Sequence, residues 1–297
     1  MTTPPPQNGV LVLVATPIGN LGDLSPRAVR ALADADVIAC EDTRRTRHLL
    51  THEGIPAGGR LVTVNDHTEA AQVQSLLGRL DAGERVALVT DAGMPAVSDP
   101  GERLVAAAAA AGHRVEVVPG PSAALAALVV SGLPTGRFCF EGFLPRKGRA
   151  RAQRLAEVAA EGRTTVMFEA PHRVRQTVAD LGEVIDPQRR LVIARELTKA
   201  FEEVWRGTLA TAGAHLAATD PRGEYVLVLD GAAPAPAADA GDVDHALQLR
   251  LDAGVDKKAA IAEVAAELGV PKRQVYEAAL LLAASPPRAG PQPRPPP

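Results

Sequence analysis

The sequence predicts an α/β protein of two domains followed by a small C-terminal helical segment. Short apolar runs of strand length alternate with helix-patterned stretches through residues 10–231, which is the pattern of α/β folds. Loops rich in Gly, Pro and acidic residues follow several of these runs, as in open sheets that bind a ligand beyond the carboxyl ends of their strands. An Ala-, Pro-, Asp- and Gly-containing linker at 232–242 then precedes a helix-patterned stretch at 243–284.

The first domain is expected over residues 10–119 as a parallel sheet with helices on both faces. Ser25 is expected to cap a helix that begins at Pro26, because Ser is favoured at the cap and Pro at the first helical position. Ala70–Leu80 is another helix-patterned stretch. The apolar runs predict strands at Val10–Ala15, Val37–Cys40, Leu61–Val64, Val86–Thr90 and Val115–Val118.

The second domain is expected over residues 120–231, after a new start at Pro119–Ser122. The apolar stretch Ala123–Val130 predicts a buried helix. Further helices are expected at 149–161, 172–185 and 208–218, and strands at Phe138–Phe140, Thr164–Glu169, Leu191–Arg195 and Tyr225–Leu229.

The two ends of the chain and the C-terminal segment differ in composition from the domains. Residues 1–9 and the proline-rich residues 285–297 are expected to be disordered tails. Lys257–Leu268 and Lys272–Leu282 resemble a helix-turn-helix around Gly269. Residues 240–297 carry seven Lys and Arg against seven Asp and Glu, so packing or dimerisation is favoured over nucleic-acid binding for this segment.

Composition excludes several classes of protein. The net charge of −3 means that any contact with RNA must come from a local patch. Cys40 and Cys139 lie far apart, which argues for a reducing compartment and against a disulfide scaffold or a zinc knuckle. No apolar run is long enough to span a membrane, and the first residues do not have the pattern of a signal peptide. We therefore expect a cytoplasmic protein without membrane association.

The loop Asp91–Gly101 is the strongest indication of a ligand site. It joins an apolar run to a helix-like run, and Gly93 allows close approach of the backbone to a ligand. Asp99 is expected to cap a helix that starts at Pro100, with Glu102 at the third position, which would leave free N–H groups facing the loop. The Asp-Ala-Gly portion alone is equally typical of a rigid turn, whereas the whole loop is far more specific.

Other loops at strand ends are expected to meet this one in a single cleft, because the strand ends of one sheet share an edge. Neither a GxGxxG after the first strand nor a GxxxxGK[ST] is present, which argues against dinucleotide dehydrogenases and P-loop NTPases. His48 and His52 lie four residues apart, but a solvated helix face explains them better than a metal site, and no metal is predicted. The converging loops are Thr16–Asp23, Glu41–Arg44, Asp91–Gly101, Pro119–Ser122, Glu169–Arg173 and Arg195–Lys199.

Taken in order, the motifs resemble the ribosomal RNA methyltransferases of the tetrapyrrole methylase superfamily. The resemblance covers residues 10–230 well and 240–284 loosely. It implies two α/β domains of the tetrapyrrole methylase type, whose S-adenosylmethionine fold is not the Rossmann type, and a homodimer. It rests on Ala15–Asp23, Glu41–Arg44, Asp91–Gly101, Pro119–Ser122, Gly132–Pro134, Glu141–Pro145, Glu169–Arg173, Arg195–Lys199 and Gly223–Val226.

The resemblance also implies an activity and a set of site residues. The reaction is methyl transfer from S-adenosylmethionine to the 2′-hydroxyl of a cytidine in the decoding region of 16S rRNA, in the small ribosomal subunit. By position, the cofactor would lie against Pro17, Asp91, Ala92, Gly93, Pro95, Ser98, Pro119, Gly120, Pro121, Ser122, Phe168, Glu169 and Arg195. The chain departs from the family at Thr68, where Asn is usual, at Met94, where Thr is frequent, and at Ala170, where Ser is frequent.

Chemical reasoning adds candidates for catalysis and for RNA contact. A ribose hydroxyl is a poor nucleophile, so alignment with the methyl group and a nearby base would both contribute. Glu41, Asp42, Glu196 or His67 is expected to act as that base or to position the hydroxyl. The run 146–154 holds five cations in nine residues and is either a solvated face or a phosphate-binding surface. The residues expected to contact RNA phosphates are Arg44, Arg146, Lys147, Arg149 and Lys199.

Two other functions remain open on the sequence alone. A methyltransferase acting on corrin-type small molecules would need a wide cleft without a basic rim. A non-enzymatic nucleic-acid-binding protein would use residues 243–284 and would not bind S-adenosylmethionine.

Overall fold

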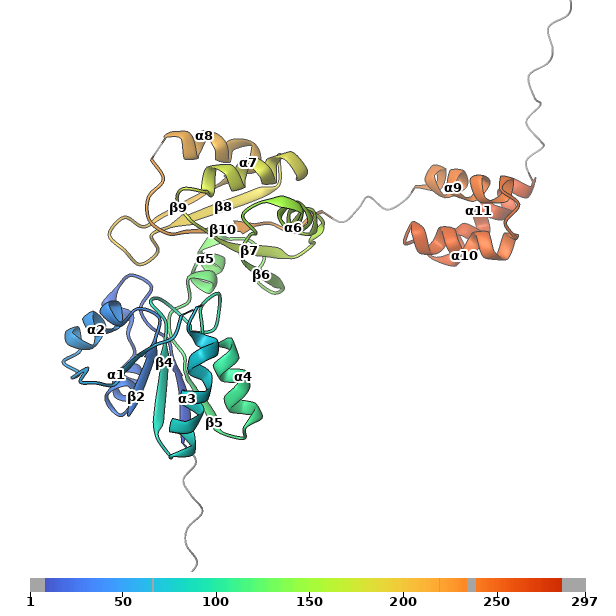
Figure 1. Cartoon of the computed structure of the whole chain (residues 1–297). Helices are drawn as coiled ribbons and strands as arrows, with labels where there is room; N and C mark the ends of the chain where they lie inside the picture. Colours follow the sequence, from blue (N-terminus) through green and yellow to red (C-terminus); the bar gives the residue numbers. More distant parts are fainter. Residues whose placement is uncertain (1–8, 66, 219, 234–238, 285–297) are drawn as a thin grey trace, which may run out of the picture. The chain divides into compact units, whose positions relative to one another are not determined.

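The computed structural model describes residues 9–65, 67–218, 220–233 and 239–284, so most of both predicted tails lies outside the described residues (Figure 1). The chain divides into two compact units, residues 1–232 and 233–297. The first unit contains two five-stranded sheets, and the second contains three helices. None of the helices in the described parts is long and apolar enough to cross a membrane.

The first sheet is parallel throughout, as predicted, with strand order β3-β2-β4-β1-β5. Alternate strand residues face opposite sides, so Val12 and Ile38 pack toward α1 and α2 while Leu11 and Val37 pack toward α3 and α4. Ser25 accepts a hydrogen bond from the Ala28 N–H at the start of α1, which confirms the predicted cap. The elements are β1 (Val10–Val14), a short 3₁₀ turn (Leu21–Asp23), α1 (Pro26–Ala33), β2 (Val37–Cys40), α2 (Thr43–His52), β3 (Leu61–Thr63), α3 (Glu69–Asp81), β4 (Arg85–Val89), α4 (Glu102–Ala110) and β5 (Arg114–Val118).

The second sheet is mixed, with strand order β6-β7-β10-β8-β9, and only β6 and β7 are parallel among its neighbours. Helix α5 packs against one face, and α6, α7 and α8 cover the other. The segment Pro119–Ser122 joins β5 directly to α5 and so leads from one sheet to the other. The elements are α5 (Ala123–Ser131), β6 (Phe138–Phe143), α6 (Gly148–Ala160), β7 (Thr164–Glu169), α7 (Val174–Val184), β8 (Arg190–Arg195), β9 (Glu203–Thr208), α8 (Leu209–Ala218) and β10 (Tyr225–Leu229).

Strand β9 was not expected from the sequence. Among the strands that the structure describes, β9 pairs only with β8, at the edge of the sheet, and none of its residues is fully buried. Its side chains therefore do not form the continuous apolar run by which buried strands are recognised.

The predicted cap of α4 was wrong. The helix begins at Glu102 with Gly101 at the cap position, and no side chain of the cap residue contributes. Instead the buried carboxylate of Glu69, at the start of α3, accepts hydrogen bonds from the N–H groups of Gly101, Arg103 and Leu104 at 3.0, 2.9 and 3.3 Å. A residue far away in sequence therefore satisfies the free donors at the helix N-terminus.

The C-terminal unit is a bundle of α9 (Ala240–Asp252), α10 (Lys257–Glu267) and α11 (Lys272–Ala284) around a small core that includes Leu247 and Val264. Helix α9 begins at Ala240, inside the stretch predicted as linker, because Asp239 and Asp242 form a reciprocal capping box. The paired helices α10 and α11 correspond to the predicted helix-turn-helix pattern.

Candidate functional site

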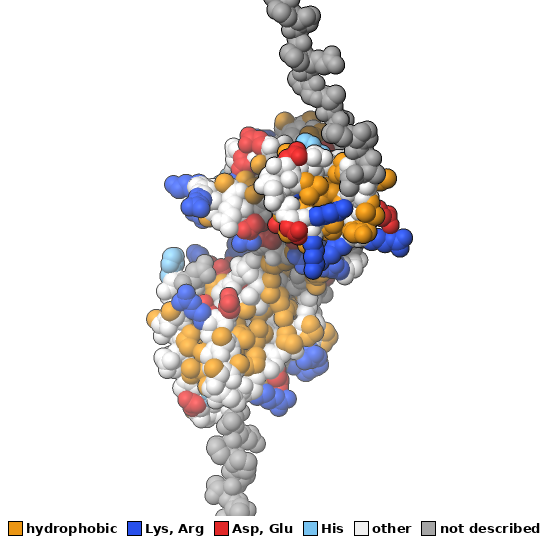
Figure 2. Space-filling model, turned by 90° about the vertical axis from the view of Figure 1, so that its right-hand side faces the viewer, with side chains coloured by type: hydrophobic (Ala, Val, Ile, Leu, Met, Phe, Trp, Pro, Cys, Tyr) orange, Lys and Arg blue, Asp and Glu red, His pale blue; other side chains and the backbone are white. Residues whose placement is uncertain are grey.

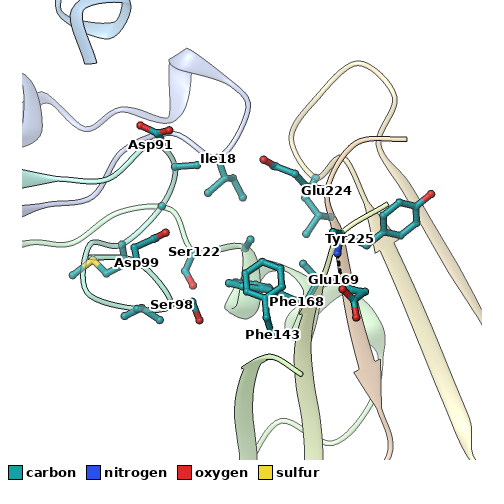
Figure 3. Close-up of a pocket in the computed structure, with 18 of the residues that line it drawn as sticks. Ile18, Asp91, Ser98, Asp99, Ser122, Phe143, Phe168, Glu169, Glu224 and Tyr225 are labelled. Carbon is teal, nitrogen blue, oxygen red and sulfur yellow. Dashed lines mark hydrogen bonds between the residues drawn. The ribbon is translucent and has the colours of Figure 1, made fainter. Parts of the chain in front are cut away.

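A cavity of about 370 Å³ lies at the carboxyl ends of β1, β2 and β4 and against the ends of β7 and β10 (Figure 3). Figure 3 shows Asp91, Ser98 and Ser122 on one side, facing Phe168 and Glu224 on the other. The lining residues are Ile18, Glu41, Arg45, Asp91, Ala92, Gly93, Met94, Val97, Ser98, Asp99, Ser122, Ala123, Phe143, Phe168, Glu169, Ala170, Pro171, Leu197, Glu224, Tyr225 and Val226. Both halves of the first unit therefore contribute walls to this cavity.

Backbone hydrogen bonds hold the loops after β1 and β4 together. Thr16 and Gly93 exchange two of them, at 2.9 and 3.1 Å, and the Thr16 hydroxyl donates to the Thr90 carbonyl at 3.1 Å. Gly93 has φ +83°, and a Cβ at this position would lie 3.4 Å from Ile18 Cγ2. Glycine thus gives the loop a left-handed residue where it passes close to its neighbour.

The loop Asp91–Gly101 also carries backbone strain. Ala96 and Ser98 have φ angles of +66° and +62°, a region that non-glycine residues rarely adopt. Such residues cost about 1–3 kcal/mol each and persist where the surroundings fix them. A Cβ at Gly142 of β6 would lie 2.8 Å from the Ser98 hydroxyl, so the glycine in β6 permits close approach to the strained loop.

Two carboxylates, Glu41 and Asp91, give the cavity a negative wall. Glu41 Oε2 accepts a hydrogen bond from the Thr90 hydroxyl at 3.0 Å, and Asp91 Oδ1 accepts one from the Asp42 N–H at 3.1 Å. Burial and the charge of Glu41 raise the pKa of Asp91, while the Arg45 guanidinium, 3.4 Å from Oδ2, opposes that rise. This wall suits a ligand that carries positive charge.

The opposite wall is apolar and aromatic. The Phe168 ring packs edge-on against Phe140 and Phe143, with centroids 5.0 and 5.6 Å apart. Leu197 and Val226 extend this surface. A flat, uncharged ring can pack here, opposite the polar side of the cavity.

Glu169, at the end of β7, is almost fully buried and its carboxylate is occupied by the protein. It accepts hydrogen bonds from the Ala170 N–H at 2.9 Å and the Thr177 hydroxyl at 2.6 Å, and Arg173 lies 3.5 Å away. These contacts fix the turn after β7 that forms one edge of the cavity.

Glu196, Lys199 and Glu224 form a network beside the cavity. Lys199 Nζ lies 2.9 Å from both Glu196 Oε1 and Glu224 Oε2, and the Glu224 N–H donates to Glu196 at 3.0 Å. Partial burial acts to raise the pKa of Glu196, but hydrogen bonds from Lys199 and Glu224 outweigh it and lower the pKa. Gly19 packs against the Lys199 side chain, since a Cβ there would lie 2.3 Å from Lys199 Cγ.

The structure brings together about half of the residues expected to bind the cofactor, and one expected to act in catalysis. Those that line the cavity are Asp91, Ala92, Gly93, Ser98, Ser122, Phe168, Glu169 and Glu41. Those that do not line it are Pro17, Pro95, Pro119, Gly120, Pro121, Arg195, Asp42, His67 and Glu196.

Several residues outside the lining have other contacts. Asp42 caps α2 and pairs with Arg44 at 2.7 Å, and these hydrogen bonds hold its pKa at about 2. Arg195 pairs with Glu203 at 2.9 Å. His67 is exposed. Pro17 lines a second, smaller cavity of about 220 Å³.

Some lining residues were missed, although most belong to motifs that the sequence shows. Ile18, Phe143 and Leu197 lie within the quoted motifs Ala15–Asp23, Glu141–Pro145 and Arg195–Lys199, and Arg45 lies in the basic run that starts at Arg44. Glu224 follows Gly223 in the last quoted motif. Aliphatic and aromatic walls carry no signal in one sequence, because the same residues build cores.

The cations expected to contact RNA fall into two groups. Arg44 and Lys199 are paired with carboxylates. Arg146, Lys147 and Arg149 are exposed and make no side-chain hydrogen bond or ion pair with any residue that the structure describes. We name these three the free basic cluster.

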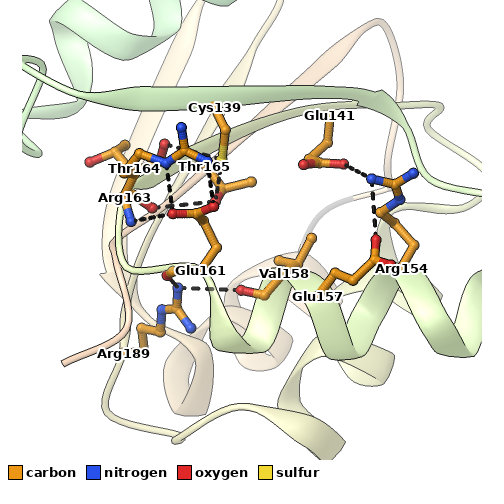
Figure 4. Close-up of polar contacts among 10 residues, drawn as sticks. All are labelled: Cys139, Glu141, Arg154, Glu157, Val158, Glu161, Arg163, Thr164, Thr165 and Arg189. Carbon is orange, nitrogen blue, oxygen red and sulfur yellow. Dashed lines mark hydrogen bonds and ion pairs between the residues drawn. The ribbon is translucent and has the colours of Figure 1, made fainter. Parts of the chain in front are cut away.

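The rest of the basic run is built into the fold. Arg151 is buried and binds Asp180, the Thr177 hydroxyl and the Pro145 carbonyl. Arg154 lies 3.0 Å from Glu141 and 3.3 Å from Glu157 (Figure 4). Within the described ranges, no group of three or more His, Cys, Asp or Glu side chains is arranged to hold a metal ion.

Comparison with known proteins identifies close relatives. A family model described as Tetrapyrrole (Corrin/Porphyrin) Methylases matches residues 10–213. A protein named ribosomal RNA small subunit methyltransferase I from Synechocystis sp. is 46% identical over 278 residues, covering 93% of this chain and 99% of that protein. Proteins of the same name from Xylella fastidiosa and Mycobacterium tuberculosis are 51% identical over 240 residues and 48% identical over 274 residues, covering 80% and 92% of this chain and 86% and 95% of those proteins.

Solved structures share the fold. Uroporphyrin-III-C-methyltransferase from Thermus thermophilus superposes with a TM-score of 0.51 at 25% identity, covering 75% of this chain and 94% of that one. Cobalt precorrin-4 methyltransferase gives a TM-score of 0.58 at 17% identity, covering 77% and 97%. The second likeness is one of fold alone.

Proposed function

Because the chain belongs to the tetrapyrrole methylase family and, within it, to the family of ribosomal RNA small subunit methyltransferase I, we propose that it methylates 16S rRNA. The methyl donor is S-adenosylmethionine, and the acceptor is the 2′-hydroxyl of a cytidine in the decoding region. The observation that carries the proposal is identity of 46% across 93% of the chain with a protein of that name. The polar and aromatic walls of the main cavity support it.

The residues of the main cavity fit the cofactor. Its volume of about 370 Å³ lies in the range of small-molecule sites. Phe143, Phe168 and Val226 offer an apolar surface for an adenine ring, and Ser98 and Ser122 offer hydroxyl groups. Glu41 and Asp91 would attract the positively charged end of the molecule.

The chain's own contribution to the reaction is placement and proton removal. S-adenosylmethionine, when bound, supplies a methyl group on a sulfonium that is a good leaving group. Glu41 is the one member of the expected catalytic set that lines the cavity, so we assign it the role of accepting or orienting the proton of the acceptor hydroxyl. A base in reach adds about 10²–10⁴-fold, and alignment of the reacting atoms supplies the rest.

The acceptor's phosphates are assigned to the free basic cluster. Arg146, Lys147 and Arg149 lie on the loop between β6 and α6 and on its first turn, close in sequence to Phe143 of the cavity wall. Exposed cations without protein partners can exchange their counterions for RNA phosphates. Because its substrate is ribosomal RNA, we also propose that the protein is located in the cytoplasm.

We also propose that the protein is a homodimer, formed through the apolar side of the first unit. Val115 and Val117 on edge strand β5 are 37% and 46% exposed, and Leu125 and Val129 on α5 are 50% and 67% exposed. Figure 2 shows hydrophobic side chains gathered on the lower body, on the side where β5 and α4 lie in Figure 1. Exposed apolar patches of this kind mark association surfaces. Light scattering of the Val129→Glu variant, compared with the wild type, tests it: an unchanged dimer mass would refute this surface.

The proposed function is tested by offering labelled S-adenosylmethionine with three acceptors in parallel. These are small ribosomal subunits lacking the modification, naked 16S rRNA and a reduced porphyrinoid. We expect label in RNA and none in the porphyrinoid, with the rate reduced in Glu41→Gln by at least about a hundredfold if the residue is the base. Label only in the porphyrinoid would replace the proposal with the small-molecule activity.

A further inference from the structure

The second cavity, of about 220 Å³, shares a wall with the main cavity. It lies between the loop after β1 and helix α2, with the end of β4 between them. Arg45 and Asp91 line both cavities. Its remaining lining residues are Thr16, Pro17, Leu21, Thr46, His48, Leu49 and Thr90.

The walls of the second cavity are suited to a flat, polar-edged ring. Pro17, Leu21 and Leu49 supply an apolar surface, and His48 on α2 supplies an exposed imidazole. At about 30 Å³ per water, the cavity holds the space of about seven waters. That is room for a single unstacked base.

The wall that the two cavities share connects the second cavity to the main cavity, where we propose that the methyl group is transferred. In Figure 3 the Asp91 carboxylate points away from Ser98 and Ser122. Its Oδ2 lies 3.4 Å from Arg45 Nε, and this is the one ion pair of Arg45 in the described chain, with the side chain 64% exposed. The terminal nitrogens of Arg45 are therefore available at the boundary between the two cavities.

We propose that the second cavity binds the acceptor nucleotide, a single pyrimidine ribonucleotide turned out of the RNA stack. This inference rests on the proposed function and adds to it the place of the acceptor. The base packs against Pro17 and Leu21, and Arg45 binds the adjoining phosphate or stacks on the ring. Sequence-specific RNA recognition targets such unstacked bases, commonly on apolar or guanidinium surfaces.

This arrangement has a geometric consequence for the reaction. A nucleotide in the second cavity presents its sugar to the wall formed by Asp91 and Arg45, beyond which Glu41 lines the main cavity. The acceptor hydroxyl and the methyl group then approach each other from the two cavities. Leu21 and His48 line only the second cavity, so changes there separate acceptor binding from cofactor binding.

The test measures cofactor Kd by calorimetry and acceptor KM with small ribosomal subunits, for three variants. Leu21→Trp fills the second cavity, His48→Ala opens it, and His52→Ala is the matched control one turn further along α2, outside both linings. We expect Leu21→Trp to raise the acceptor KM at least about tenfold, as for the loss of one stacked base. His48→Ala should raise it by a smaller factor, and cofactor Kd should stay unchanged in all three.

A second arm is independent of RNA methylation. Saturation-transfer NMR follows cytidine 5′-monophosphate binding to the full chain loaded with S-adenosylhomocysteine, in the wild type and in His48→Ala. Weaker binding in His48→Ala supports the acceptor site, and equal binding in both proteins overturns it. If the wild type binds the nucleotide at this site but transfers no methyl group to RNA, it is the proposed function that fails. If the wild type methylates RNA and the acceptor KM is the same in Leu21→Trp and His52→Ala, it is the acceptor site that fails.

Discussion

At the scale of single residues, the buried Glu69 and the half-buried Asp91 organise the site by accepting hydrogen bonds from backbone N–H groups. Glu69 caps the N-terminus of α4 by accepting hydrogen bonds from its first N–H groups. Asp91 accepts a hydrogen bond from the Asp42 N–H, just after β2. Each joins segments that are distant in the sequence. These contacts hold the loop Asp91–Gly101 in its left-handed turns.

Glu69→Gln should loosen this loop. The amide keeps one acceptor oxygen but loses the charge, and hydrogen bonds to charged groups are worth about 1.5–3 kcal/mol each. We expect the free energy of unfolding to fall by about 2 kcal/mol and the Kd for S-adenosylmethionine to rise several-fold. Asp256→Asn is the control, because Asp256 caps α10 in the helical unit. If both variants lose stability and neither changes the cofactor Kd, Glu69 has a structural role only.

Asp91→Asn should show a stability effect that depends on pH. Burial and Glu41 raise the pKa of Asp91 in the folded protein. Its protonated form therefore favours folding, and that contribution is lost as the pH rises through the raised pKa. We expect the difference in Tm between Asp91→Asn and the wild type to increase from pH 4 to pH 7. The variant should also transfer methyl groups more slowly than the wild type.

Asp42→Asn provides the comparison of opposite sign. The pKa of Asp42 is held at about 2 by hydrogen bonds from Arg44, so its ionised form favours folding. That contribution is present near neutral pH and is lost as the pH falls toward 2. A Tm difference for Asp91→Asn that runs in the same direction as that of Asp42→Asn would contradict the assignment.

At the scale of elements, the parallel sheet, the ligand loops and most strands of the second sheet follow from local sequence pattern. The edge strand β9 and the cap of α4 do not. Continuous apolar runs such as Val86–Val89 identify buried strands on their own. Strand β9 is a half-exposed edge that depends on β8, and the cap of α4 depends on Glu69. Such interactions join residues that are far apart in the sequence, so local sequence pattern does not predict them.

The same reasoning explains why part of the site was found and part was missed. The loops that end β2 and β4 follow from the sequence, and with them Glu41, Asp91 and Gly93. The prediction placed whole motifs in the cleft, but a loop can present only some of its side chains to one cavity. Asp42 therefore caps a helix while its neighbour Glu41 lines the cavity.

Gly223→Ala tests the turn before β10. Gly223 has φ +80°, and a Cβ would lie 2.3 Å from the Glu196 carboxylate. Gly112 is the matched control, with φ +79° and nothing within 4 Å of the Cβ position. Both variants should lose about 1–2 kcal/mol for the left-handed residue. Only Gly223→Ala should also raise the cofactor Kd, because displacing Glu196 disturbs Glu224 at the cavity wall; equal Kd values would show that the network is remote from binding.

At the scale of the whole molecule, the protein presents cations locally despite its net charge of −3. The free basic cluster is a set of exposed cations that the fold does not use. Replacing Arg146, Lys147 and Arg149 together by Gln should flatten the salt dependence of RNA binding by about 2 in the slope of log K against log salt. The matched variant replaces Lys257, Lys258 and Lys272 of the helical unit. A flatter slope in that variant instead would place RNA binding on the helices and favour the nucleic-acid-binding alternative.

The most direct test of the central claim is the identity of the methylated nucleoside. Small ribosomal subunits that lack the modification are incubated with the protein and S-adenosylmethionine, and their 16S rRNA is digested and separated by mass. The account predicts 2′-O-methylcytidine, formed by the wild type and strongly reduced with Glu41→Gln. A methyl group on a base, or unmodified RNA from a protein that binds the cofactor, would contradict it.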